Sequence, residues 1–127
     1  MIFNVGDRVF YTRNGEYGKV TEVDYSYDKP IVAQRDGSEW DMCYYPDGKL
    51  YLSSEEPAII LVDGNEKEIE KYKIKIKIRE LKHSIYEIEE IIKVNEKYPI
   101  LLKYLESTKI EFDKEINIQQ ELCDRIK

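Results

Sequence analysis

The chain has 127 residues, which is enough for one domain or for one small domain with an appended segment. Hydrophobic residues make up 42% and charged residues 36% of it, the composition of a charge-rich globular protein. No apolar run approaches the roughly 20 residues of a membrane span, and no basic and apolar leader opens the chain, so we expect a cytoplasmic protein without membrane contact.

The net charge of −6 is unevenly distributed along the chain. Residues 1–64 hold twelve acidic and six basic residues, whereas the remainder is balanced. An acidic module repels phosphate and is poorly suited to grip nucleic acid, but it suits a basic partner surface. The other interpretation is that the charge only keeps a small domain in solution.

The first half alternates short β-type runs with glycine turns. Strands are predicted at residues 8–13, 17–25, 30–34, 39–45, 49–52 and 57–62. Asn14-Gly15, Asp36-Gly37, Asp47-Gly48 and Asp63-Gly64 provide the turns. This pattern favours a small antiparallel β-barrel over residues 1–64.

The opening motifs resemble those of known barrels. VGDRV at residues 5–9, followed by GEYGKV at 15–20, resembles the first hairpin of SH3-like barrels such as CarD-type, KOW and Tudor-like modules. With YYPDGK at 44–49 and PAIIL at 57–61, residues 3–62 also resemble small phage and prophage accessory proteins. That resemblance implies host cytoplasm as the location and, for some such proteins, inhibition of host defence.

Aromatic and acidic side chains in this half are the candidate binding residues. Alternation makes neighbours such as Phe10 and Tyr11 face opposite ways, so some aromatic residues are expected outside. Exposed Tyr and Trp on a rigid barrel are good anchors for a protein partner. The predicted partner-binding set is Tyr25, Tyr27, Trp40, Asp24, Asp28, Asp36, Glu39 and Asp41.

The second half, residues 65–127, predicts a long antiparallel helical hairpin with coiled-coil-like spacing, so the fold class is α+β. Asn65 is the expected cap of the first helix and Pro99 opens the second. Residues 72–78 alternate with period two, and a strand there is the open alternative to helix. The first seam, also the predicted oligomerisation surface, is Ile74, Ile78, Leu81, Ile85, Ile88 and Ile92, extended by Asn95.

The second helix has a more polar seam, and several apolar residues of the two helices lie outside both seams. The seam runs Leu101, Leu105, Thr108, Phe112, Glu115, Gln119, Leu122 and Ile126. Ile69, Ile76, Tyr86, Ile91, Leu102, Ile110, Ile116 and Ile118 lie off both seams. Because each side chain left in water forfeits roughly 1.5–3 kcal/mol, this surplus predicts a homodimer or a protein target.

Ordinary catalysis is not favoured. His83 is the sole histidine, so no catalytic triad or two-histidine metal site can be assembled, and we expect no metal and no other cofactor. Cys43 and Cys123 are far apart in sequence and are expected to be reduced thiols in or near the core. Pairs such as Asp24 with Asp28 arise by chance at this acid content.

Three functions follow, of which a non-enzymatic inhibitor of a host protein is preferred. Its concrete form is an anti-CRISPR or other anti-defence protein whose acidic barrel occupies the basic groove of a host nuclease. The second is a nucleic-acid or RNA-polymerase adaptor with phosphate contacts from Lys71, Lys73, Lys75 and Lys77. The third is a structural virion or scaffold component.

Overall fold

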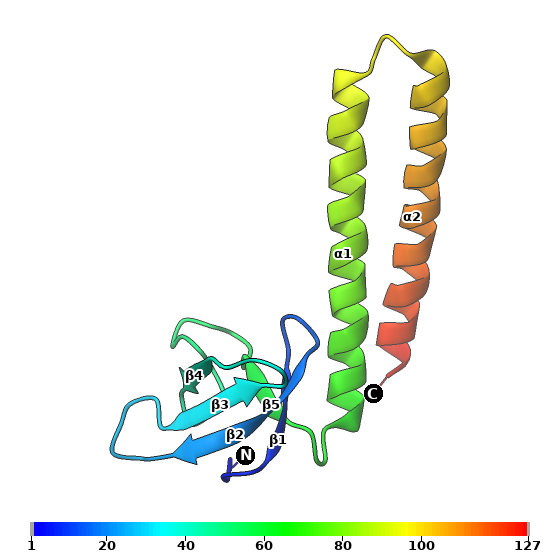
Figure 1. Cartoon of the computed structure of the whole chain (residues 1–127). Helices are drawn as coiled ribbons and strands as arrows, with labels where there is room; N and C mark the ends of the chain where they lie inside the picture. The colour runs from blue at the N-terminus through cyan, green and yellow to red at the C-terminus, as the bar shows by residue number, and fades with distance from the viewer. Residues whose placement is uncertain (1, 127) are drawn as a thin grey trace. The chain divides into compact units, whose positions relative to one another are not determined.

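A computed structural model describes residues 2–126, which form a curled five-stranded antiparallel sheet followed by two helices (Figure 1). The α+β class is therefore confirmed. The chain divides into two compact units, Met1–Lys73 and Ile74–Lys127, here called the β unit and the hairpin unit. The boundary falls inside the first helix, whose first turns belong to the β unit.

The sheet is a meander whose last strand returns to the first. Its strands are β1 (Arg8–Tyr11), β2 (Tyr17–Val23), β3 (Ile31–Arg35), β4 (Asp41–Tyr44) and β5 (Ile59–Leu61). Their order is β4-β3-β2-β1-β5, and every pair is antiparallel. Five of the six predicted strands are present; four are shorter than predicted, and β3 keeps the predicted length of five residues but is shifted by one.

The predicted strand at residues 49–52 is wrong, because this segment forms bends and a turn. The carbonyl oxygen of Lys49 accepts the Tyr45 N–H, and that of Gly48 accepts the N–H groups of both Ala58 and Ile59. These bonds fold the segment back toward the start of β5 instead of extending it. Leu50 packs against the core, while Leu52 is exposed.

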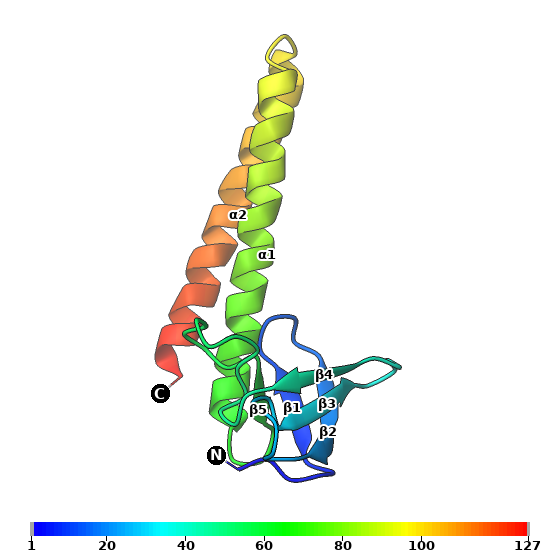
Figure 2. The same ribbon diagram turned by 90° about the vertical axis from the view of Figure 1, so that its left-hand side faces the viewer.

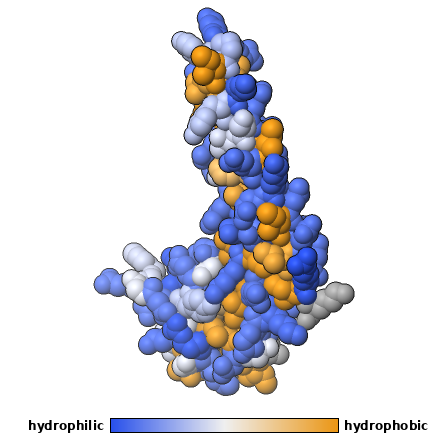
Figure 3. Space-filling model, turned by 90° about the vertical axis from the view of Figure 1, so that its right-hand side faces the viewer, coloured by the Kyte–Doolittle hydropathy of each residue, from blue (hydrophilic) through white to orange (hydrophobic). Residues whose placement is uncertain are grey.

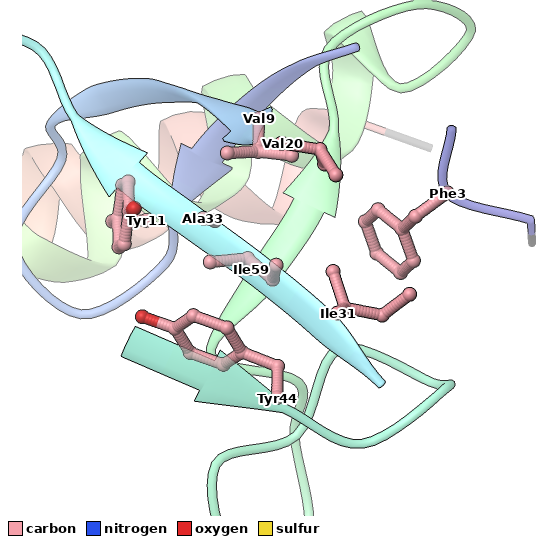
Figure 4. Packing of buried hydrophobic residues seen from close by; sticks show 8 residues of the cluster. All are labelled: Phe3, Val9, Tyr11, Val20, Ile31, Ala33, Tyr44 and Ile59. Atoms are coloured by element: carbon pink, nitrogen blue, oxygen red, sulfur yellow. The ribbon is translucent and has the colours of Figure 1, made fainter. Parts of the chain in front are cut away.

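One face of the curled sheet encloses the main core, as Figure 4 shows. Alternate residues of β1, Val9 and Tyr11, point into it, and burial of such side chains is the main source of stability in a small domain. The Tyr11 ring lies edge-on to that of Tyr44 at 6.4 Å. The complete cluster is Phe3, Val9, Tyr11, Val20, Ile31, Ala33, Tyr44 and Ile59.

The opposite face of β1 is buried as well, so Phe10 and Tyr11 face opposite ways as predicted and both are buried. Phe10 is fully buried, with its ring 5.3 Å from that of Tyr17 and 6.5 Å from that of Tyr72. Tyr72 and the buried Ile69 come from the first turns of α1, Glu66–Val94. Both sides of β1 are therefore covered within the β unit.

A β-bulge in β2 shapes the sheet. Val20 pairs with Ala33 and Glu22 with Val32, so Thr21 is an extra residue in the strand. Without the bulge, Val20 and Glu22 would face the same way, but Val20 is buried and Glu22 is exposed. Bulges also increase local twist, in keeping with the curl of the sheet.

Helix α1 and helix α2 (Pro99–Arg125) form an antiparallel pair in the hairpin unit (Figures 1 and 2). The Lys77–Glu115 and Glu89–Lys109 ion pairs, 3.7 and 2.8 Å, join them in opposite running order. Residues 72–78 are helical, as preferred, and Pro99 occupies the first helical turn. Across residues 2–126, no helix has the length and apolarity to cross a membrane.

The predicted α1 seam is half or fully buried at every position, but the α2 seam is displaced at its ends. Leu101 and Leu122 are exposed by 39% and 42%, while Leu102 is half-buried and Cys123 is buried. The reason is that a helix of 3.6 residues per turn drifts away from a strict seven-residue repeat. Consequently Leu102 and Ile116 are not part of the exposed surplus.

Candidate protein-binding cleft

The eight predicted binding residues lie in two groups at opposite ends of β3. Asp24, Tyr25, Tyr27 and Asp28 lie in the β2–β3 loop, whereas the other four, beginning with Asp36, follow β3. The five residues of β3 span about 16 Å at 3.3 Å per residue. The structure therefore provides two separate surfaces where the sequence predicts one.

The first surface borders a cleft of about 460 Å³. Its floor follows from strand register, because Glu22 pairs with Val32 and Val32 pairs with Cys43 across three neighbouring strands. The loop contributes the rest of the wall. The complete lining is Glu22, Asp24, Tyr27, Asp28, Lys29, Pro30, Val32 and Cys43.

Hydrogen bonds hold the β2–β3 loop in a closed turn. The Asp24 N–H donates to the Pro30 carbonyl at 2.9 Å, closing the loop at its base. One carboxylate oxygen of Asp24 accepts the N–H and the hydroxyl of Ser26, at 3.0 and 2.7 Å. The Ser26 donors lower the pKa of Asp24, which keeps this wall of the cleft negative.

Three carboxylates face one ammonium group around the cleft, so its net charge is negative. The Lys29 ammonium lies 5.1 Å from the Tyr45 ring centre and 5.4 Å from that of Tyr51, both in cation–π range. Its charge is thus directed at two aromatic faces. Tyr27, 68% exposed, supplies an uncommitted aromatic surface at the cleft.

The second surface lies beyond the other end of β3, and basic side chains there partly neutralise its acidic residues. The Asp36 carboxylate accepts two hydrogen bonds from the Arg8 guanidinium, one of 2.8 Å, and these lower the pKa of Asp36. Trp40, 82% exposed, borders a hollow of about 270 Å³ that is also lined by Arg35 and Met42. Glu39 and Asp41 are exposed nearby. Arg8 thus neutralises Asp36, and Arg35 is paired with Glu16 at 3.2 Å.

Exposure of Tyr25, Tyr27 and Trp40 was predicted and the structure shows it. Their role in binding a partner stays a prediction. The cleft residues that the prediction missed are Glu22, Lys29, Pro30, Val32 and Cys43. One signal was available for Glu22: Val20 and Val23 are three apart in a strand, which indicates a bulge and turns Glu22 to the other face.

The four candidate phosphate-binding lysines do not form one stripe. Steps of two residues rotate around a helix by more than half a turn each, which separates Lys71 and Lys75 from Lys73 and Lys77. The Lys73 ammonium lies 5.3 Å from the Tyr17 ring centre, and Lys77 pairs with Glu115. On a strand all four would have shared one face.

The remaining candidates have simple settings. The predicted oligomerisation residues of α1 are half or fully buried within the single chain, so they are not an open surface. His83 is exposed, and its Nε2 lies 2.8 Å from Oε1 of Glu87, one helical turn later. Both cysteines are free, and Cys123 is buried, but Cys43 is exposed at the cleft, contrary to the core expectation. Cys43 faces outward because it continues the Glu22–Val32 row.

No protein-family model, curated protein or solved structure matches the chain.

Proposed function

We propose that this is a non-enzymatic binding protein whose β unit receives a basic side chain of a partner protein in the acidic cleft. The observation that carries the proposal is the 460 Å³ cleft with Glu22, Asp24 and Asp28 around an apolar floor. An arginine side chain has matching parts: an aliphatic stem for Val32 and a planar cation for the carboxylates. Tyr27 provides a ring on which a guanidinium stacks.

The charge of the β-rich half supports the same conclusion. Its excess of six acids makes a negative field that attracts a basic surface and speeds the encounter. The exposed Tyr25, beside the cleft in sequence, is an anchor of the type enriched at protein interfaces. Binding is therefore expected to weaken strongly as salt is raised.

The concrete biological form that we propose is an inhibitor of a host defence protein, such as an anti-CRISPR, which occupies a basic nucleic-acid groove. Support comes from the phage-type resemblance of residues 3–62 and from the acidic surface. The return of β5 to pair with β1 supports an SH3-like description of the sheet. The location in the host cytoplasm belongs to the same proposal.

A titration with a short arginine-rich peptide, followed by amide NMR shifts, tests the cleft. We expect shifts concentrated at residues 22–32 and 43, with affinity falling as salt increases. Asp24→Asn with Asp28→Asn should abolish these shifts. The matched control, Glu39→Gln with Asp41→Asn, removes the same charge at the other end of β3 and should retain them.

If both double variants lost peptide binding equally, net charge alone would explain the binding, and the cleft would not be the binding site. An affinity indifferent to salt would remove the groove-mimicry form. Duplex DNA binding that is lost in Lys73→Glu with Lys77→Glu would instead favour the nucleic-acid adaptor. Presence of the protein in purified phage particles would favour the virion component.

A further inference from the structure

Two ion pairs mark the two sides of the helical hairpin. Lys77–Glu115 and Glu89–Lys109 each join α1 to α2. Glu89 lies twelve residues beyond Lys77, which is a third of a turn away at 3.6 residues per turn. The pairs therefore flank the helix–helix seam on opposite sides, and each identifies one face of the hairpin.

The face marked by Lys77–Glu115 carries fewer charges toward the tip, where the exposed Glu87 borders it. Seven-residue steps stay on one side of a helix, so Ser84 and Ile91 follow Lys77, and Thr108 and Leu101 mirror them on α2. Asn95 and Tyr104 fill the turns between, while Ile88 is buried in the seam. We call the distal face the six residues Ser84, Ile91, Asn95, Leu101, Tyr104 and Thr108.

The distal face combines exposed apolar side chains with polar side chains that are hydrogen-bonded to their own helix. Ile91 and Tyr104 are 45% and 70% exposed. Its polar side chains already donate to carbonyls of their own helix: Ser84 to Glu80, Asn95 to Ile91 and Thr108 to Tyr104, at 2.8–3.1 Å. Covering this face therefore leaves the Ser84 and Thr108 hydroxyls paired, whereas the Tyr104 hydroxyl and the second Asn95 amide N–H need an acceptor from the covering surface or from water at its edge.

The opposite face is charged along the same length. Lys82, Glu89 and Lys93 of α1 lie beside Glu106, Lys109 and Asp113 of α2. The Glu89–Lys109 bond lowers the pKa of Glu89 and raises that of Lys109, so both stay ionised. Figure 3 shows a small hydrophobic patch near the tip of the hairpin, with hydrophilic side chains around it on the face in view.

We infer that a second copy of this chain covers the distal face, with the two hairpins parallel about a two-fold axis that runs along them. In this arrangement α1 of each copy lies on α2 of the other. Lys77 and Glu115 pair within one hairpin, so they lie at the same height along its length. A two-fold axis parallel to the helices keeps this height, so each Lys77 also meets the partner copy's Glu115. Ile91 then faces the partner copy's Leu101.

The alternative, antiparallel stacking with full overlap, is unfavourable. In that arrangement the two-fold axis runs across the helices near Ser84, and α1 of one copy lies on α1 of the other. Lys77, seven residues before Ser84, then faces the partner copy's Ile91, seven residues after it. A lysine covered by an apolar side chain loses its hydration without gaining a partner charge. The Lys77–Glu115 match thus favours the parallel dimer.

The available area fits a dimer of moderate affinity. The 21 residues of α1 in the hairpin unit make a face about 30 Å long, and two packed helices make it about 20 Å wide. About 600 Å² per copy, or about 1,200 Å² in total, is at the lower limit for specific interfaces. We therefore expect a weak, concentration-dependent dimer that does not involve the cleft in the β unit.

Sedimentation velocity of the full chain across micromolar concentrations tests the inference with two matched tyrosines. Tyr104→Glu places a charge on the distal face and should weaken dimerisation tenfold or more. Tyr86→Glu makes the same change at a 58% exposed tyrosine outside the distal face and should leave it unchanged. Circular dichroism confirms that both variants keep their helices.

Orientation is measured by energy transfer between dyes on Glu96→Cys, in a chain carrying Cys43→Ser and Cys123→Ser. Transfer should be strong, because a parallel dimer places the two tips together. A monomer at every concentration, or equal weakening by both tyrosine variants, would overturn the proposed surface. A dimer with weak transfer would overturn the parallel arrangement.

Discussion

Gly48 is a left-handed glycine of the β unit that lies close to a neighbouring backbone segment. It adopts φ +86°, and its carbonyl accepts two N–H bonds from the start of β5. A Cβ built there would lie 2.3 Å from the Ile59 carbonyl oxygen and 3.3 Å from the Phe3 ring. Gly37 has φ +77° but nothing within 4 Å of its Cβ position.

These two glycines separate conformational strain from lack of space. Gly37→Ala should lower the free energy of unfolding by about 1 kcal/mol, the cost of a left-handed alanine. Gly48→Ala has the same conformational cost, and its Cβ also displaces β5. We therefore expect the free energy of unfolding to fall by about 3 kcal/mol. Urea unfolding of both variants measures the difference, and equal losses would show that the crowding around Gly48 relaxes freely.

The Arg8–Asp36 pair predicts a pH dependence of stability. Arg8 lowers the pKa of Asp36 in the folded chain below its ordinary value near 4, which the unfolded chain retains. The resulting stabilisation is present above about pH 4 and is lost as the pH falls through the folded-state pKa. Asp36→Asn should therefore be less stable than the wild type at pH 7 and should converge with it in acid.

Urea midpoints between pH 2 and pH 7 measure this convergence. Asp28→Asn removes one carboxylate from the same unit and is the control for net charge. Identical pH profiles for the two variants would show that the bond to Arg8 has no effect on stability.

Among the elements, the helical hairpin offers two isoleucines with different surroundings. Ile78 of α1 is 6% exposed, whereas Ile110 of α2 is 55% exposed. Ile78→Ala should cost about 3 kcal/mol through lost burial and the cavity left behind. Ile110→Ala should change stability by less than about 0.5 kcal/mol. Loss of helical circular dichroism in urea measures both, and a similar cost at the two sites would contradict the seam.

The strand and helix assignments show where local pattern was sufficient. Residues 72–78 alternate like a strand, yet they are helical because the seam continues through Leu81 without a turn residue. Leu50 and Leu52 alternate in the same way but form no strand, because the Gly48 carbonyl ties the chain back to β5. Alternation over four residues cannot show which backbone bonds a neighbouring segment offers.

For the whole molecule, the division of the chain inside α1 leads to a test with fragments. The β unit includes α1 as far as Lys73, and within it Ile69 is buried and Tyr72 contacts Phe10. A fragment of residues 1–73 should be more stable than one of residues 1–64 by about 2 kcal/mol, since the shorter one exposes Phe10.

Urea unfolding of the two fragments measures this gain. Fragment 1–73 with Ile69→Asp is the matched control and should fall back to the stability of 1–64. Equal stability of 1–64 and 1–73 would support the boundary predicted from sequence.

Composition and periodicity alone determined the α+β class, the turns, the two long helices and the acidic character of the first half. These are local properties, because glycine and proline constrain their own backbone and apolar spacing marks a buried face. Only the tertiary structure decided that the acidic and aromatic residues form two surfaces, that Glu22, Val32 and Cys43 make one cleft, and that Phe10 is covered by α1. Strand register, one bulge and the drift of a helix set these relations between distant residues, and no local pattern contains them.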